Sequence, residues 1–516
     1  MSSEYVGRIP ASWTLLELAD VCSKVTDGTH KTPDYQQDGV RFISIKNIKP
    51  FQPIDWSAYE RFISEDEHRE LIRRCKPEYG DILFPRIGTL GYAKRIDFRE
   101  EVSIFVGLGL AKPIRELVLP EYLEYWLNHP AIDKLSRERA NGSGRLTLPL
   151  EESKKLPVPM APLAEQARIT ERLDELLSDL DAGISELKAA QRKLAQYRQS
   201  LLKAAVDGTL TADWRAAQGK PKETGAELLQ RILKERRARW EQKQLAKFAE
   251  QGKSPPKGWQ AKYLEPAAPD FSKLPSPPDG WTWATVEQLA ELASGHTPKD
   301  AGLFADRNGD VPWFKVGDMN TAGNEEKLLV SSVKFTKEHA KELGLKVVPA
   351  DTIVFPKRGG AIATNKKRRL SASAAYDLNM MGLVSAPSAA DWLWAWFQGV
   401  DLAKLSDGSN IPQINNPDIA PLTLPIPPAS EQKEILEQLA QALDNASTQE
   451  EAIAKMLQQS AAQRKNLLKA AFSGQLVPQD PNDEPTSVLL ARIRAERESG
   501  ATTTAKKRGR KAKEKM

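Results

Sequence analysis

The feature that most constrains this chain is a stretch that occurs twice. SLLKAAVDGTL occupies positions 200–210 and NLLKAAFSGQL occupies 466–476, so the second copy follows the first by 266 positions. The same offset, without a gap, aligns LPVPMAPLAEQ (156–166) with LTLPIPPASEQ (422–432). The length between the two anchors is therefore the same in both copies, which favours a rigid element over a loop.

Apolar residues between the anchors recur at alternating steps of four and three, the heptad pattern of coiled-coil helices. The expected seam residues are Leu173, Leu180, Leu187, Leu194 and Leu201 in the first copy and Leu439, Ile453, Met456 and Leu467 in the second. Prolines precede each segment and a glycine, Gly208 or Gly474, follows it, as is typical of helix ends. We expect two helices of about 66 Å, paired as an antiparallel coiled coil. In the alternative, each helix packs separately on its neighbouring domain.

The repetition extends weakly upstream of both helices. GDILFPRIGTLGYA (80–93) resembles ADTIVFPKRGGAIA (350–363), and NGSGRLTLP (141–149) aligns with DGSNIPQIN (407–415). Short β-branched and aromatic runs, broken by Gly, Pro and Asn, predict a strand-rich unit with several helices. The expected fold class is therefore α+β, with two pseudo-symmetric globular domains joined by the two helices.

The expected domain boundaries follow the repeat. They are a globular domain at 1–160, a helix at 161–208, a linker with a basic helix at 209–280, a second globular domain at 281–424, a second helix at 425–475, and a C-terminal helix with a disordered basic tail at 476–516. In the linker, ELLQRILKERRARWEQKQLAKFAEQ (227–251) predicts a charge-laced helix, which SVLLARIRAERES (487–499) echoes.

The net charge of +5 does not indicate a basic folded region. Residues 506–516, KKRGRKAKEKM, carry a net charge of +6, and residues 1–505 carry 67 basic and 68 acidic side chains. A nucleic-acid-binding surface would therefore have to be a local patch. With only Cys22 and Cys75, no leader-like segment and no apolar run of the ~18 residues that a membrane helix needs, we expect a cytoplasmic protein.

Sequence signatures of catalysis are absent. The chain has no GxxxxGK[ST] phosphate loop, no G-x-G-x-x-G after a strand and no Asn-Pro-Pro-aromatic tetrapeptide, and its five histidines lack metal-ligand spacing. We therefore expect neither a catalytic residue nor a metal site in this chain.

Basic loops recur at aligned positions of the two units. Lys and Arg neutralise phosphates, Arg contacts guanine bidentately and Asn pairs with adenine. The expected DNA-binding residues are Thr29, Lys31, Arg86, Thr89, Tyr92, Lys94 and Arg95 in the first unit, and Lys357, Arg358, Asn365, Lys366, Lys367, Arg368 and Arg369 in the second. For each of them, a solvated turn is the alternative.

Two similar readers on a rigid spacer suit duplex DNA, because half-sites on one face recur every ~34 Å. Since the loops of the two units differ in sequence, the two half-sites should differ as well. The expected target is bipartite and asymmetric.

Several motifs, in this doubled order, carry a family resemblance. They are DGTHKTPDY (27–35), GDILFPRIGTLGY (80–92), GSGRLTLPLEESKKLPVP (142–159), DGSNIPQIN (407–415), the Glu-Gln pairs at 165–166 and 431–432, and the two LLKAA segments. Over essentially its whole length, the chain resembles the specificity (S) subunit of a type I restriction-modification enzyme.

The resemblance implies two target recognition domains, each reading half of a split DNA sequence. It also implies that the helices set the half-site spacing and dock two modification (methyltransferase) subunits, which restriction (endonuclease and translocase) subunits join. S-adenosylmethionine, ATP and Mg are expected in those partner subunits, and no cofactor in this chain. The long central insert and the basic tail depart from the family pattern, so their role stays open.

Two other classes of function are weighed against this one. The first is a coiled-coil scaffold protein without sequence-specific DNA binding, and the second is a free-standing enzyme. Basic loops at aligned positions of both units are expected for paired DNA readers but would be accidental in a scaffold. An enzyme would need a catalytic pair, which the sequence does not reveal.

Overall fold

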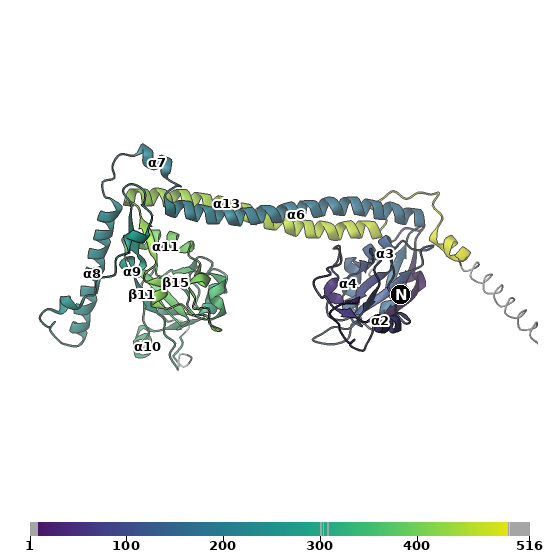
Figure 1. The fold of residues 1–516 in the computed structure, drawn as a ribbon, viewed down its shortest axis with the longest axis horizontal. Helices are drawn as coiled ribbons and strands as arrows, with labels where there is room; N and C mark the ends of the chain where they lie inside the picture. Colours follow the sequence, from purple (N-terminus) through teal and green to yellow (C-terminus); the bar gives the residue numbers. More distant parts are fainter. Residues whose placement is uncertain (1–8, 300–301, 303, 307–308, 494, 496–516) are drawn as a thin grey trace, which may run out of the picture. The chain divides into compact units, whose positions relative to one another are not determined.

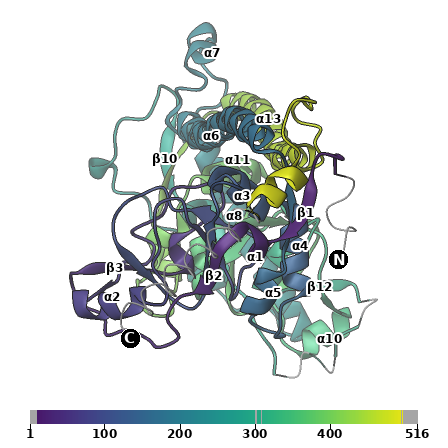
Figure 2. The same ribbon diagram turned by 90° about the vertical axis from the view of Figure 1, so that its right-hand side faces the viewer.

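The chain forms two units, and each unit contains part of both long helices. The computed structural model describes residues 9–299, 302, 304–306, 309–493 and 495. Unit 1 comprises Met1–Ala189 and Ile453–Met516, and unit 2 comprises Ala190–Ala452. Both units combine sheets with helices (Figures 1 and 2), so the expected α+β class is confirmed.

The globular part of unit 1 holds three small sheets, with strand orders β1-β9, β2-β8-β5-β6 and β4-β3-β7. Its elements are β1 (Thr14–Glu17), α1 (Leu18–Val21), β2 (Cys22–Asp27), β3 (Val40–Ile43), η1 (Ile45–Asn47), β4 (Phe62–Ile63), α2 (Glu65–Ile72), β5 (Ile82–Pro85), β6 (Lys94–Arg95), β7 (Val102–Ile104), β8 (Leu108–Pro113), α3 (Pro120–Leu127), α4 (Pro130–Glu138), α5 (Leu150–Lys154) and β9 (Pro157–Met160).

Unit 2 repeats this arrangement with strand orders β10-β19, β11-β18-β15-β16-β13 and β14-β12-β17. Its elements are α7 (Ala212–Ala217), α8 (Gly225–Glu250), η2 (Trp259–Lys262), η3 (Phe271–Lys273), β10 (Thr282–Thr285), α9 (Val286–Leu289), β11 (Ala290–Ser294), β12 (Val311–Phe314), η4 (Val316–Asn320), β13 (Lys327–Leu328), β14 (Val333–Phe335), α10 (Lys337–Glu342), β15 (Ile353–Pro356), η5 (Gly360–Thr364), β16 (Arg368–Leu370), β17 (Ala375–Tyr376), β18 (Met380–Ser385), η6 (Pro387–Ala389), α11 (Ala390–Gln398), η7 (Leu402–Leu405), α12 (Asn416–Ile419) and β19 (Thr423–Ile426).

In each unit the first strand pairs with the last strand before a long helix. Thr14 lies opposite Met160 in unit 1, and Thr282 lies opposite Ile426 in unit 2. These sheets have only two strands, so both strands are edges and tolerate the prolines of the repeated PVPM and TLPI segments. Each globular part therefore begins and ends at one place, next to the start of a long helix.

The two long helices are α6 (Leu163–Asp207) and α13 (Ala429–Phe472), of 45 and 44 residues. Both are followed by a glycine in the left-handed region, Gly208 with φ of 78° and Gly474 with φ of 71°. A glycine adopts this conformation without the steric cost that a Cβ would add. The expected helices, with their starts after proline and their glycine stops, are confirmed.

Within each unit the segments of α6 and α13 run antiparallel. In unit 1, Arg464 of α13 pairs with Asp181 of α6. In unit 2, Arg198 of α6 donates to Ser447 of α13 and pairs with Glu450 at 3.3 Å. Arg198 and Arg464 occupy the same position of the sequence repeat, so the two units use the same cross-helix contact. The expected antiparallel pairing is confirmed.

The predicted seam residues are buried to different degrees. Leu173, Leu194, Leu201 and Leu439 are buried, whereas Leu180, Leu187, Ile453 and Leu467 are partly buried. Met456 differs from the expectation, because it is 50% exposed. The helices bury a second face against the globular parts, so a single heptad seam does not describe them.

Unit 1 shows this second face clearly. The ring of Phe472 in α13 lies 5.0 Å from the rings of both Tyr122 and Trp126 in α3. Leu468 and Ala471 belong to the same buried cluster. Figure 1 shows α3 on the side of the globular part that faces the long helices, so α3 is one element on which the globular part meets them.

The repeated Glu-Gln pair fixes the start of each long helix. Trp13 Nε1 donates to Glu165 at 2.9 Å, and Trp281 Nε1 donates to Glu431 at 2.8 Å. The next residue, Gln166 or Gln432, donates to the carbonyl oxygen five residues earlier, at 2.9 and 3.0 Å. Burial raises the pKa of the Glu165 carboxyl. The repeated pair is thus a structural device that ties the helix start to the first strand.

The segment after each long helix docks beside the start of the other helix within the same unit. In unit 2, Thr211 and Arg215 both donate to Glu431 at 2.8 Å. In unit 1, Gln479 donates to Glu165, and Thr486 Oγ1 donates to the Met160 carbonyl at 2.8 Å. The LLKAA segment therefore recurs where each long helix ends, next to the start of the other long helix in the same unit.

The expected basic helix is α8, whose Leu228, Leu229 and Ile232 enter the core of unit 2. Its echo is helical over 486–493, and Leu489 packs in the core of unit 1. The basic tail KKRGRKAKEKM lies outside the described residues. Among the helices that the structure describes, none is both long and apolar enough to cross a membrane.

Candidate nucleic-acid interface

Two loops of unit 1 leave the same edge of one sheet. Strands β2 and β5 are each antiparallel to β8, so they run in the same direction and end at Asp27 and Pro85 on a common edge. Backbone bonds add two further segments, because Arg86 N donates to Gly107 O at 2.8 Å and Leu148 N donates to Arg86 O at 2.7 Å. We call the loops 28–32 and 86–92, with segments 105–107 and 141–148, edge 1.

Unit 2 builds the equivalent edge with equivalent bonds. Lys357 N donates to Asn379 O at 2.8 Å, and Ile414 N donates to Lys357 O at 2.9 Å. Loops 295–299 and 357–365, with segments 377–379 and 407–414, form what we call edge 2. The similar sequence motifs, Phe-Pro-basic and Gly-Ser, therefore meet in space in both units.

A buried carboxylate, Asp27, compensates the charge of Arg86 at edge 1. Asp27, only 2% exposed, pairs with both Arg86 and Arg74, and lies 3.0 Å from His30 Nε2. Arg86 is itself buried and also donates to the Leu148 carbonyl at 3.2 Å. Arg86 thus ties two segments of edge 1 together, while the side chain of Arg74 is more than half exposed.

At edge 2 the basic residue after the strand, Lys357, has a neutral partner. Lys357 Nζ donates to Ser294 Oγ at 3.2 Å, where unit 1 has the pair of Arg86 and Asp27. Burial, and next the charge of Arg358, lower the pKa of Lys357. Arg358 itself is exposed. Among the described residues, Lys357 therefore has a hydroxyl partner where Arg86 of edge 1 has a carboxylate.

Four further residues predicted for unit 1 lie on the loops of edge 1. Thr29 is half-buried, and its Oγ1 accepts from Lys31 N at 3.2 Å, while Lys31 and Thr89 are exposed. Tyr92 donates weakly to the Ile48 carbonyl at 3.4 Å, and burial raises its pKa.

Lys94 and Arg95 belong to strand β6 and not to a loop. Lys94 is buried and pairs with Asp97 at 2.9 Å, and Arg95 pairs with Glu121 at 3.3 Å. Glu124 lies between both cations, at 3.8 and 3.5 Å. Their placement gives them internal ion pairs, which the spacing of residues could not reveal.

The basic run at 366–369 is also tied to the protein. Lys366 donates to Asn320, and Arg369 pairs with Asp391 at 2.7 Å. Arg368 donates to the Asn324 carbonyl at 2.5 Å. This run therefore differs from the free basic loop that the sequence suggested, because β16 carries two of its members into the sheet.

Lys367 is the most deeply placed member of the run. It is only 4% exposed and donates to the Val400 carbonyl at 2.5 Å and to Asn365 Oδ1 at 3.0 Å. Desolvation lowers its pKa to about 8. Asn365, with φ of 52°, is exposed but uses its side-chain oxygen on Lys367 and on Leu402 N. Both residues act first as braces of the loop.

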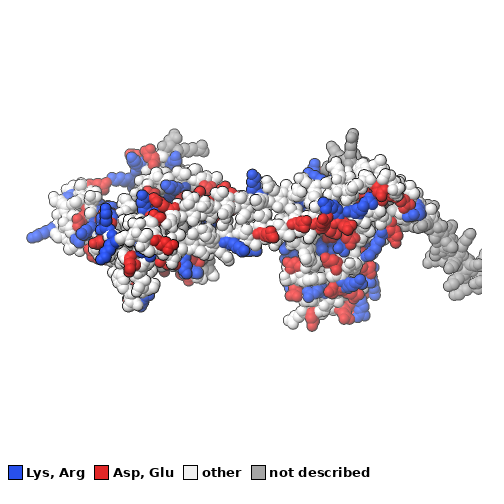
Figure 3. Space-filling model, turned by 90° about the horizontal axis from the view of Figure 1, so that it is seen from above, with Lys and Arg blue, Asp and Glu red and all other residues white. Residues whose placement is uncertain are grey.

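Sequence reasoning missed two groups. One is Asp27, whose role depends on cations at Arg74 and Arg86 that are distant in sequence. The other is a set of aromatic and basic side chains at 35–61, for which the interleaving of Tyr, Trp, Lys and Arg was an available signal. Figure 3 shows both signs of charge interspersed over the face seen there, so these local arrangements decide where a polyanion binds.

No group of three or more His, Cys, Asp or Glu side chains is arranged to hold a metal ion in the described part of the chain. Both cysteines are buried, and burial raises the pKa of the Cys75 thiol to about 11. The candidate interface consists of loops that carry cations and hydroxyls.

Comparison with known proteins identifies the family. Residues 278–459 match the family described as Type I restriction modification DNA specificity domain. The EcoDI specificity subunit, a type I restriction enzyme subunit of Escherichia coli, is 24% identical over 410 residues, which cover 77% of this chain and 80% of that protein. Residues 278–459 thus carry the specificity domain of this family, and the chain is similar to the specificity subunits of type I restriction enzymes.

The expected resemblance is thereby confirmed. The EcoBI specificity subunit, also of Escherichia coli, is 25% identical over 238 residues, which cover 45% of this chain. That match spans about half of the EcoBI subunit's own length, at 49%. A solved structure from work on complex assembly and conformational transition of the type I R-M system is 14% identical, with a TM-score of 0.57 over 91% of this chain and 99% of that one. This specificity subunit shares its fold.

Proposed function

We propose that this specificity subunit directs a type I restriction-modification complex to a bipartite, asymmetric DNA sequence, with each unit reading one half. The expected boundaries, 1–160 and 281–424, describe the two target recognition domains in this proposal. The chain itself performs no catalysis and binds no cofactor.

The observation that carries the proposal is the repeated edge with different side chains. Edges 1 and 2 lie at the ends of equivalent strands and have equivalent backbone bonds, as expected for two readers of one kind of ligand. At one equivalent position, edge 1 has Arg86 with Asp27, and edge 2 has Lys357 with Ser294. Readers that share a scaffold but differ in donors and charge suit two different half-sites.

The partners in this proposal are duplex DNA, two modification subunits and the restriction subunits. The long helices α6 and α13 dock the modification subunits and set the half-site spacing. S-adenosylmethionine, ATP and Mg act in those partner subunits. Support comes from the family, whose named relatives are specificity subunits of type I restriction enzymes.

Adenine-methylation mapping tests the proposal. The chain is expressed with its modification subunit in a methylation-free host, and a host that lacks the chain serves as the control. We expect a split motif with an unspecified gap, present only with the chain. A stable complex that adds no motif would contradict the proposal and favour a coiled-coil scaffold without sequence-specific DNA binding.

A second arm assigns the half-sites to the edges. Lys357→Gln removes a charge at edge 2 and leaves edge 1 intact. We expect the half-site read by unit 2 to relax or its methylation to fall, while the other half-site stays unchanged. Equal loss at both half-sites would contradict the assignment of one half-site to each edge.

A further inference from the structure

Tyr35, Lys46, Tyr59 and Arg61 form one surface cluster in unit 1, which we call the aromatic–cationic patch. The Arg61 guanidinium lies 5.8 Å from the Tyr35 ring centre and 5.5 Å from that of Tyr59. Lys46 Nζ lies 5.4 Å from the Tyr59 ring centre. The Tyr59 hydroxyl donates to the Tyr35 hydroxyl at 3.2 Å. Segments that are distant in sequence thus bring two cations and two hydroxyls together.

The patch is held from below by a buried amide. Asn47, 2% exposed, donates through Nδ2 to the carbonyls of Asp55 at 2.9 Å and Tyr59 at 3.1 Å. Arg61 O accepts from Phe42 N at 2.9 Å, next to the pairing of β3 with β4. The loop that carries Tyr59 and Arg61 is therefore fixed in place before any ligand arrives, which reduces the entropy cost of binding.

The two cations of the patch keep their charge available. Among the described residues, neither Lys46 nor Arg61 forms an ion pair, whereas Arg41 pairs with Glu60 at 3.7 Å and Lys49 pairs with Asp55 at 3.8 Å. Lys46 and Arg61 are exposed, and Tyr35 is 37% exposed. Aromatic faces attract a cation without neutralising it.

The Tyr35 hydroxyl remains a hydrogen-bond donor near neutral pH. Burial, and next the hydrogen bond with Tyr59, raise the pKa of Tyr35 to about 12. A protonated phenol can donate to an anionic oxygen. Two cations and a hydroxyl pair are the donor set that contacts phosphate oxygens in nucleic-acid complexes.

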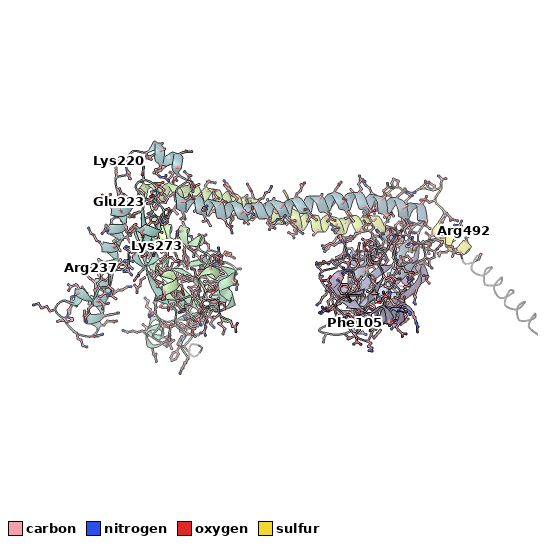
Figure 4. The ribbon with its side chains drawn as sticks, in the orientation of Figure 1. Phe105, Lys220, Glu223, Arg237, Lys273 and Arg492 are labelled. Atoms are coloured by element: carbon pink, nitrogen blue, oxygen red, sulfur yellow. The ribbon has the colours of Figure 1, made fainter. Side chains whose placement is uncertain are left out.

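Packed aromatic rings connect the patch to edge 1. The ring of Tyr35 packs edge-on against Phe42 at 5.7 Å, and Phe42 packs edge-on against Phe105 at 6.2 Å. Phe105 pairs with Thr29 in an isolated bridge of edge 1. Figure 4 shows Phe105 on the side of the globular part away from α6.

In the described part of unit 2, the loop before β14 carries different side chains. The loop before β14 is held by Asn324, which accepts from Leu329 N at 2.8 Å and from Val330 N at 2.9 Å. It presents Leu329 and Val330, 62% and 49% exposed. The patch therefore distinguishes unit 1 from unit 2.

We propose that the aromatic–cationic patch is a phosphate-binding surface that holds the DNA backbone beside edge 1. This inference rests on the proposed function, because it takes duplex DNA as the ligand of unit 1. The patch positions the duplex and adds affinity for every sequence, while the loops of edge 1 distinguish the bases.

The salt dependence of binding tests this inference. The full chain, with any subunits that accompany it, is titrated into a pool of fluorescent duplexes of random sequence over a range of sodium chloride concentrations. Each phosphate contact contributes ~0.9 to the slope of log K against log salt. We expect Lys46→Gln and Arg61→Gln each to reduce the slope by ~0.9, and the double variant to reduce it by ~1.8.

The matched control is Arg69→Gln on α2. Arg69 is an exposed cation of the same unit that is already paired with Asp66 at 2.7 Å. Its replacement by Gln changes the net charge by the same amount as either single variant of the patch. We expect its slope to equal that of the unaltered chain. An unchanged slope in the double variant, or an equal reduction in the control, would overturn the inference.

A second variant separates the hydroxyls from the rings. Tyr35→Phe with Tyr59→Phe keeps the aromatic faces under both cations and removes the donors. We expect severalfold weaker binding at every salt concentration and an unchanged slope. Unchanged affinity would remove the hydroxyls from the proposed surface, and a lower melting temperature would assign them a structural role instead.

Selection from the same pool separates the two proposals. If the unaltered chain selects a bipartite motif and the slopes do not change, only the phosphate surface is refuted. If the unaltered chain binds but selects no bipartite motif, the proposed function fails, and the slopes still test phosphate contact. If it does not bind the pool at all, both proposals fail.

Discussion

Single residues in this chain repeat their roles at positions far apart in sequence. Glu165 and Glu431 each accept from a tryptophan that precedes the first strand, Trp13 or Trp281. Arg86 and Lys357 leave their strands at the same place but meet an acid and a serine. The scaffold contacts are kept, while the edge contacts change, which is the pattern expected when function resides in the loops.

Removing the carboxylate of Glu431 should destabilise the chain strongly. Glu431 is 2% exposed and accepts from Thr211, Arg215 and Trp281. Glu431→Ala leaves buried donors and one cation without their acceptor, so we expect a loss of ~3 kcal/mol in the free energy of unfolding. Denaturant titration measures it.

The control for this variant lies two turns further along α13. Glu437 is exposed and pairs with Lys433 at 3.6 Å, so Glu437→Ala should change the free energy of unfolding by less than ~0.5 kcal/mol. Equal losses in the two variants would show that the buried hydrogen bonds of Glu431 contribute little.

Acid should destabilise unit 1 through His129. Burial, and next the charge of Lys469, lower the pKa of His129 from 6.5 to about 4. The folded state therefore favours neutral imidazole, whose contribution is complete above pH ~6.5 and is lost as the pH falls toward ~4, up to about 3 kcal/mol.

The variant His129→Asn tests the assignment to His129. Asn does not titrate and can still accept from Ala131 N as the helix cap. When the free energy of unfolding is measured at a series of pH values, this variant should not show the decrease between pH ~6.5 and ~4. A decrease as large as that of the unaltered chain would assign the pH dependence to other groups.

At the scale of elements, the heptad pattern predicted both long helices, and the flanking prolines and glycines predicted their ends. It did not predict Met456 at 50% exposure, since a helix that packs on a globular part and on a second helix buries two faces. Leu468, one residue after the predicted Leu467, is the more deeply buried, because it faces α3. Periodicity identifies a buried face but not the partner that buries it.

The glycine that ends α6 should resist substitution. Gly208 has φ of 78°, and a Cβ there would meet Pro278 at 2.8 Å. We expect Gly208→Ala to lower the free energy of unfolding by more than ~1 kcal/mol, because strain and contact add. Thermal unfolding measures the effect.

Gly183, in the middle of the same helix, is the matched control. A Cβ at Gly183 would meet nothing within 4 Å. We expect Gly183→Ala to raise the free energy of unfolding by ~0.5–1 kcal/mol, because alanine restricts the unfolded chain. Effects of the same sign in both variants would contradict the role given to the helix stop.

At the scale of the whole molecule, the sequence repeat corresponds to a structural repeat. Both units have a two-stranded sheet that joins their ends, a larger sheet and a three-stranded sheet with one parallel pair. Unit 2 adds β13 to its larger sheet. The domain boundaries expected from the repeat remain a prediction.

The proposed function makes the half-site spacing depend on the long helices. Inserting seven residues within 163–206 keeps the heptad phase and lengthens the helix by ~10 Å. Because α6 and α13 pair antiparallel, a matching insertion in α13 preserves their contacts. We expect methylation mapping to find both half-sites unaltered and a different gap between them. An unchanged gap would refute the spacing role.

The sequence by itself determined the long helices, their glycine ends, the doubling of an α+β domain and the family, because these depend on periodicity and on motifs in a fixed order. Only the tertiary structure decided which cations are available. Lys94, Lys367 and Arg369 look like free basic residues in sequence, but burial and acceptors from distant segments engage them. Tyr59 and Arg61 form the patch together with Tyr35, and only folding brings Tyr35 beside them. Electrostatic roles depend on distances of a few Å, which the order of residues along the chain does not contain.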